Sequence, residues 1–154
     1  MLKKISIILL FLFFNSCGYE AMHSKKNITS YDFSISEITL EGDRNFNLEI
    51  KKQLNNYTLT KKDKNFRLEI RSISNKETVS KDVAGNPSSF KNSVTMYVNV
   101  LVNNKIKKAL IIQESFNYNN NANKFNLKEY EKDIKNNLAE SSAKKLVFKL
   151  SNIQ

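Results

Sequence analysis

The chain has 154 residues and a formal net charge of +10, from 25 basic and 15 acidic side chains. It contains three glycines and one proline, and 40% of its residues are hydrophobic, which excludes a collagen-like or fully disordered chain. The single cysteine excludes an internal disulfide, and one histidine leaves little material for a transition-metal site or a nucleophilic dyad.

The first predicted element is a secretory leader. Lys3 and Lys4 precede an apolar run, residues 5–14, that has about half of the ~20 residues needed to cross a bilayer. The run ends in Phe-Asn-Ser-Cys at 14–17, which resembles the bacterial lipobox, although Leu is usual where Phe14 stands. An ordinary signal peptide with a chance cysteine, or a short N-terminal anchor, is the alternative interpretation.

The lipobox resemblance implies that residues 1–16 are a lipoprotein signal peptide and that Cys17 is the lipid attachment site. Three acyl chains, palmitate among them, would make a stable membrane anchor, since one chain alone binds only marginally. Gly18 replaces the Asp that would resemble an inner-membrane retention signal, so we expect the outer membrane of a Gram-negative envelope, with the domain on its periplasmic side. Residues 17–30 are polar and are interpreted as a lipidated tether, in which His23 is expected to be solvated.

Residues 31–154 are predicted to form a single domain. A strand is expected from Ser30 to Leu40, with a bulge at Ser36-Glu37 because the apolar alternation slips by one residue there. Gly42 ends the strand, and Asp43 is a suitable N-cap for a helix. The apolar face of that helix would consist of Phe46, Ile50, Leu54 and Tyr57.

Three further strands and a helix follow. Alternation predicts strands over 65–73, 93–102 and 106–118, with a polar stretch at 74–82. Turns are expected at 84–87, which reads Ala-Gly-Asn-Pro, and at Asn103-Asn104, because Asn tolerates positive φ.

The last predicted helix runs from Asn126 to about Leu150, with Glu129 completing a capping box. Ser142 fills a gap in its apolar stripe beside Ala139 and Ala143, which favours close packing on a sheet. The order β-α-β-β-β-α predicts an α+β two-layer sandwich, with two helices on one face of a four-stranded, mostly antiparallel sheet and one parallel pairing.

The sequence contains no catalytic constellation and no glycine-rich phosphate loop, so we expect a protein that binds or scaffolds and is not an enzyme, with no cofactor and no metal. Removal of Lys3 and Lys4 with the leader leaves a formal charge of about +8 on the mature chain. Such a surface attracts anionic lipid or acidic protein, and export argues against nucleic acid as a partner.

The order of motifs resembles the LPS-assembly lipoprotein family, LptE. The closest stretches are Cys17-Gly18-Tyr19, Gly42-Asp43-Arg44, and Ser115-Phe116-Asn117-Tyr118 leading into Tyr130 and Leu138-Ala139. The resemblance covers the mature chain, but no single motif is diagnostic. The chain departs from the family at Ala21-Met22, where Pro-Leu-Tyr is frequent, and at Tyr130-Glu131, where Tyr-Ala is common.

This resemblance implies a two-protein translocon, in which the lipoprotein plugs the outer-membrane β-barrel LptD, helps it assemble and binds lipopolysaccharide. Family members use basic side chains at the loop end of the sheet for that ligand. Lys81 and Lys91 are expected in the connection between the second and third strands and are the preferred ligand-binding candidates. The second set of candidates lies at the next turn and consists of Lys105, Lys107 and Lys108. The alternative interpretation is that these lysines are solvated and bind no ligand. The other functional class is a structural or pilotin-like outer-membrane lipoprotein of another assembly machine.

Overall fold

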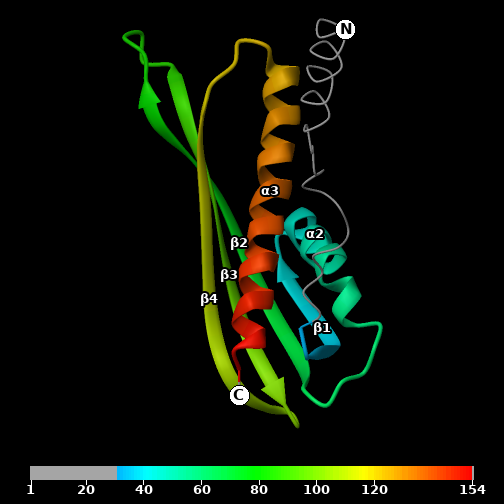
Figure 1. The fold of residues 1–154 in the computed structure, drawn as a ribbon. Helices are drawn as coiled ribbons and strands as arrows, with labels where there is room; N and C mark the ends of the chain where they lie inside the picture. Colours follow the sequence, from blue (N-terminus) through cyan, green and yellow to red (C-terminus); the bar gives the residue numbers. More distant parts are fainter. Residues whose placement is uncertain (1–30, 154) are drawn as a thin grey trace, which may run out of the picture. The chain divides into compact units, whose positions relative to one another are not determined.

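The computed structural model describes residues 31–153, which form two helices, a short 3-10 helix and a four-stranded sheet (Figure 1). The elements are β1 (Ser34–Gly42), α2 (Arg44–Leu54), η3 (Asn55–Tyr57), β2 (Asn65–Lys81), β3 (Pro87–Val102), β4 (Lys105–Asn119) and α3 (Lys124–Ser151). The strand order is β1-β2-β3-β4, with β1 parallel to β2 and the other pairs antiparallel. The predicted α+β class and the predicted order of elements are therefore confirmed.

One face of the sheet is apolar, and both helices cover it (Figure 1). The strands contribute alternate residues to this core, as expected for side chains that point to one face. The buried strand residues are Ile35, Phe66, Leu68, Ile70, Val94, Met96, Val98, Val100, Leu110 and Ile112. The helices contribute Phe46, Ile50, Leu54, Ala139, Ala143, Leu146, Val147 and Leu150.

The junction between β1 and α2 follows from local chemistry. The register of β1 against β2 shifts between Ile35 and Glu37, which confirms the predicted bulge. Asp43 caps α2, since its carboxylate accepts hydrogen bonds from the backbone N–H of Asn45 at 3.0 Å and of Phe46 at 3.1 Å. Burial raises the pKa of Asp43, but these bonds, a hydrogen bond with the Ser74 side chain and the charge of Lys135 outweigh burial and lower the pKa.

The hairpin strands extend beyond the predicted ends. β2 continues to Lys81, although the sequence predicted a strand only over 65–73, and β3 begins at Pro87. The apolar residues on the core face of β2 end at Ile70 and the pairing with β1 ends at Ser72, while the antiparallel ladder to β3 continues. The turns were predicted correctly: Asn103 and Asn104 have φ of 50° and 61°, and a turn closes the hairpin between Lys81 and Pro87.

α3 begins earlier than predicted. Its N-cap is Asn123, whose side chain accepts from the backbone N–H of Phe125 and of Asn126, so the capping box expected at Asn126 is wrong. The predicted patch of small residues is confirmed, because Ala139, Ser142 and Ala143 are all buried against the core. The first half of α3 covers a second, smaller cluster of buried residues: Tyr118, Leu127, Ile134 and Leu138, with Phe90 packed against it.

Replacement of Gly42 by Ala should destabilise the domain more than the same change at Gly85. Both glycines have positive φ, 98° and 86°, so both substitutions incur a backbone cost of about 1–2 kcal/mol. Only at Gly42 would the added Cβ meet another atom, the Ser72 carbonyl oxygen at 1.9 Å, whereas nothing lies within 4 Å at Gly85. Urea unfolding of the two variants measures the difference, and equal losses would contradict the close approach of β1 to β2.

Candidate functional site

The lysines singled out in the sequence lie at opposite ends of the sheet. Lys81 is the last residue of β2, close to the turn that joins β2 to β3. Lys105, Lys107 and Lys108 lie at the start of β4, after the Asn103-Asn104 turn at the other end of β3. The two sets can therefore be changed independently.

The expected position of Lys91 is wrong. It lies within β3, not in the connection, and pairs across the ladder with Glu77 of β2. The Lys91 Nζ lies 3.2 Å from a Glu77 carboxylate oxygen. Because this ion pair already neutralises Lys91, Lys81 is the better available cation on this part of the hairpin.

We refer to residues 74–92, where β2 and β3 extend beyond β1, as the hairpin arm. Its tip is ordered by Asp82, whose carboxylate accepts from the backbone N–H of Ala84 at 2.9 Å and of Asn86 at 2.8 Å. The Asn86 N–H is the main reason that the pKa of Asp82 lies below its usual value. Beside this turn, the Val83 side chain is fully exposed, so the tip presents an apolar group as well as Lys81.

A polar network joins the arm to α3. One carboxylate oxygen of Glu131 receives a hydrogen bond from the Tyr118 hydroxyl at 2.9 Å and lies 2.5 Å from the Lys76 Nζ. Lys76 also lies over the Phe90 ring, 4.2 Å from its centroid. Burial, together with the bond to Glu131, raises the pKa of Tyr118, so its hydroxyl stays a donor. This network has no local signal in the sequence, since Lys76 and Glu131 are 55 positions apart.

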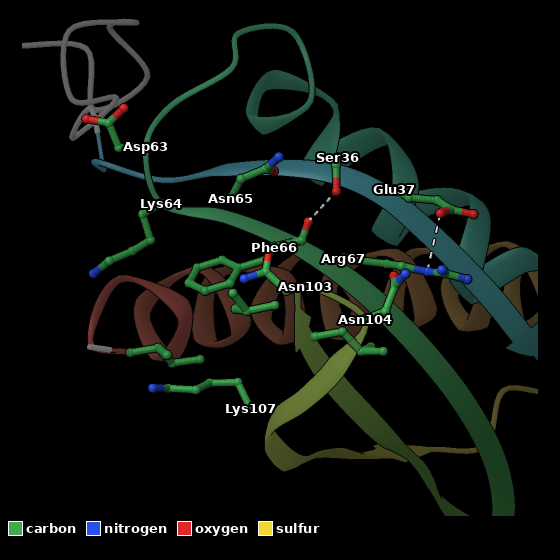
Figure 2. Close-up of a pocket in the computed structure, with 13 residues that line it drawn as sticks. Ser36, Glu37, Asp63, Lys64, Asn65, Phe66, Arg67, Asn103, Asn104 and Lys107 are labelled. Atoms are coloured by element: carbon green, nitrogen blue, oxygen red, sulfur yellow. Dashed lines mark hydrogen bonds and ion pairs between the residues drawn. The ribbon is translucent and has the colours of Figure 1, made fainter.

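At the other end of the sheet, a pocket of about 560 Å³ opens between the loop before β2 and the Asn103-Asn104 turn (Figure 2). Lys64 and Lys107 line it from these two segments, and in Figure 2 their side chains extend in the same direction. Arg67 also lines the pocket and is held by Glu37, with 3.2 Å between the Arg67 Nε and a Glu37 carboxylate oxygen. The lining carries three cationic side chains, Lys64, Arg67 and Lys107, against two carboxylates, Glu37 and Asp63, and this excess of positive charge suits an anionic group.

Cys17 and His23 lie outside the described residues. Within residues 31–153, no group of three or more His, Cys, Asp or Glu side chains is arranged to hold a metal ion. In the same part of the chain, neither helix combines the length and the apolar character needed to cross a bilayer.

The fold defines the class of this domain: a mixed four-stranded sheet whose single apolar face is covered by two helices. Solved bacterial lipoproteins share this fold. Rare lipoprotein B from Shewanella oneidensis matches with a TM-score of 0.57 and 13% identity, over 75% of this chain and 93% of that one. A minor lipoprotein from Acinetobacter baumannii matches with a TM-score of 0.57 and 12% identity, over 79% and 91%.

A lipoprotein B from Nitrosomonas europaea, solved in solution, matches with a TM-score of 0.55 and 10% identity, over 87% of this chain and 90% of that one. No family model and no curated protein sequence matches the chain. At these identities the structural comparisons show the fold, and they show that nearly the whole length of each lipoprotein is matched.

Removal of the Glu131 carboxylate should loosen the hairpin arm. Glu131→Ala leaves the Tyr118 hydroxyl without its shorter acceptor, at a cost of about 1–3 kcal/mol, so urea unfolding should show that loss. The double variant Glu131→Ala with Tyr118→Phe should lose less stability than the sum of the two single variants, because the two residues share one interaction. Glu129→Ala, a change of the exposed glutamate two positions before Glu131, is the control. Additive losses would show that the hydrogen bond contributes nothing.

Proposed function

We propose that this chain is an LptE-type lipoprotein of the outer membrane, which acts with the LptD β-barrel and binds lipopolysaccharide. The observation that carries the proposal is the coincidence of a lipobox-like leader with a domain that has the fold of bacterial lipoproteins. Rare lipoprotein B is another name for LptE. The proposed role is one of binding and assembly, since the sequence offers no catalytic constellation.

The proposed anchor is a lipid on Cys17, with the domain on the periplasmic side of the outer membrane or inside the barrel lumen. A polar outer surface suits a polar lumen. The open face of the sheet is polar in part: Glu69 and Asn99 are hydrogen-bonded neighbours, and Arg71 pairs in register with Tyr97, whose partner on β4 is the exposed Ile111. This face, which no helix covers, is the candidate for contact with the barrel wall.

The hairpin arm is the proposed site for the phosphates of lipopolysaccharide. Lys81 stands beside a turn ordered by Asp82, and the exposed Val83 at the tip can meet an acyl chain. Lys91 contributes only after its pairing with Glu77 is exchanged for the ligand. Lys105, Lys107 and Lys108 at the other end of the sheet remain the second set for this ligand.

Cys17 should carry the lipid in the mature protein. Mass spectrometry of the purified N-terminus should find Cys17 as the first residue, with an acylated amine and a thioether-linked diacylglyceryl group. Cys17→Ser should make the protein extractable from membranes by high salt, which leaves the lipidated protein bound, and should not change its circular dichroism, because residues 18–30 separate the anchor from the core. A free amine on Cys17, or cleavage at another residue, would refute the anchor.

Capture of this protein from detergent-solubilised membranes should recover a large β-barrel protein in equal amount. Depletion should reduce the correctly assembled barrel and the lipopolysaccharide at the cell surface, because the barrel would lack its plug. Normal levels of both after depletion would favour the structural or pilotin-like alternative.

Loss of charge on the arm should weaken binding to purified lipopolysaccharide. Lys81→Gln with Lys91→Gln should lower affinity at least about tenfold, since well-formed charge-assisted contacts contribute about 1.5–3 kcal/mol each. Glutamine is preferable to glutamate because a new carboxylate at position 91 would face Glu77. The comparison variant changes Lys105, Lys107 and Lys108 to Gln. If only that variant loses binding, the ligand occupies the other end of the sheet, and if neither does, the domain does not bind this ligand directly.

A further inference from the structure

We propose that the end of the domain opposite the hairpin arm is a membrane-contact surface that binds the headgroups of anionic phospholipids. We call it the turn-end surface and define it as the loop 58–64 with the first residues of β4, 105–108. The inference rests on the proposed lipid anchor, and its partner is the leaflet that holds this anchor.

The chain enters the domain at this end. The Tyr31 carbonyl oxygen accepts a hydrogen bond from the Lys62 Nζ at 2.6 Å, and the Ser34 N–H donates to the Lys64 carbonyl oxygen at 2.8 Å. The first described residues are therefore attached to the 58–64 loop. The 13 residues between Cys17 and Tyr31 span at most about 45 Å, so a lipid on Cys17 would keep this end within reach of the bilayer.

The turn-end surface holds cations that the rest of the domain does not neutralise. Among residues 31–153, six lysines elsewhere form ion pairs with acidic side chains, namely Lys52, Lys76, Lys91, Lys135, Lys144 and Lys145. Within the same range, no acidic side chain forms an ion pair with Lys61, Lys64, Lys105, Lys107 or Lys108. Asp63 lies among them, and Glu37 is already paired with Arg67. Five lysines that pair with no acidic side chain of the described residues therefore gather at this end of the sheet, as three others, Lys124, Lys128 and Lys132, do along the first half of α3.

Exposed apolar side chains stand among these lysines. Leu59 is 71% exposed in the loop before β2, and Ile106 is 60% exposed between Lys105 and Lys107. Cationic side chains beside isolated aliphatic ones are the pattern of protein surfaces that rest on the bilayer interface, where the charges meet headgroups and the aliphatic groups enter the acyl boundary.

The loop 58–64 and the start of β4 form one surface, because both line the same pocket. Lys64 and Lys107 line it from opposite sides and extend the same way (Figure 2). The backbone turn at Asn103 and Asn104, both with positive φ, places the start of β4 beside the loop before β2. A phospholipid phosphate at the rim can therefore contact lysines from both segments.

The test uses the full mature chain, residues 17–154, with Cys17→Ser so that no acyl chain contributes to binding. It should float with vesicles of phosphatidylethanolamine and phosphatidylglycerol, and it should not float with vesicles of phosphatidylcholine alone. Lys105→Gln, Lys107→Gln and Lys108→Gln together should lower affinity for the anionic vesicles at least about tenfold, because each surface lysine contributes several-fold. Higher salt should weaken binding, since the contact is electrostatic.

The matched control removes three exposed lysines from α3: Lys124→Gln, Lys128→Gln and Lys132→Gln. It has the same net charge as the test variant and should retain binding. Leu59→Ser with Ile106→Ser should lower the binding that persists at high salt. Equal losses in the two lysine variants would mean that net charge alone draws the protein to the vesicle, and no binding to anionic vesicles would overturn the proposal outright.

Failure of this proposal can be told from failure of the proposed function, because the vesicles contain neither lipopolysaccharide nor a barrel protein. A chain that ignores anionic vesicles but still captures the barrel would refute only the membrane contact. A chain that binds them through the turn-end surface but carries no lipid on Cys17 would refute only the anchor.

Discussion

The structure depends on the close packing of α3 against one face of a four-stranded sheet. Ala139, Ser142 and Ala143 are buried where the helix meets the strands, and larger side chains at these positions would push the two layers apart. Leu146 and Leu150 beyond this patch join the main core, and Leu127, Ile134 and Leu138 before it form the second cluster. α3 therefore contributes to both clusters of buried residues, one at each end of the helix.

The two ends of the sheet differ in the residues that they expose. β1 ends at Gly42, opposite Ser72, so the hairpin arm extends past the layer formed by β1 and α2 and is held to α3 through Glu131. The opposite end holds the entry of the chain, the cationic pocket and the unpaired lysines. We propose that the hairpin arm binds the ligand and that the turn-end surface contacts the membrane. These two contacts lie at opposite ends of the sheet, so one does not block the other.

The sequence predicts the parts of this fold that local chemistry determines. The bulge before Glu37, the cap at Asp43 and the turn at Asn103-Asn104 were all predicted, because alternation, capping and positive φ are visible within a few residues. The far end of β2 and the start of β3 at Pro87 were not predicted, since polar strands held only by a hairpin ladder look like a loop, and Lys91 was misplaced because it lies in that part of β3.

The helix start at Asn123 was missed because two asparagines three residues apart are equally good caps. The candidate sites were predictable only in part. The lysines of both ends are evident in the sequence, but which of them are already paired depends on contacts between distant elements, such as Lys76 with Glu131 and Lys91 with Glu77. The meeting of the 58–64 loop with the start of β4 likewise follows from the strand order and from no local pattern.

The most direct test of this account is the stability of Ala139→Leu, compared by urea unfolding with Ala109→Leu. Ala139 is fully buried in the core that α3 covers, whereas Ala109 is exposed on β4. The account predicts a loss of about 1–3 kcal/mol for Ala139→Leu, as for other overpacked cores, and little change for Ala109→Leu. An unchanged free energy of unfolding for Ala139→Leu would contradict the close approach of α3 on which both ends of the domain depend.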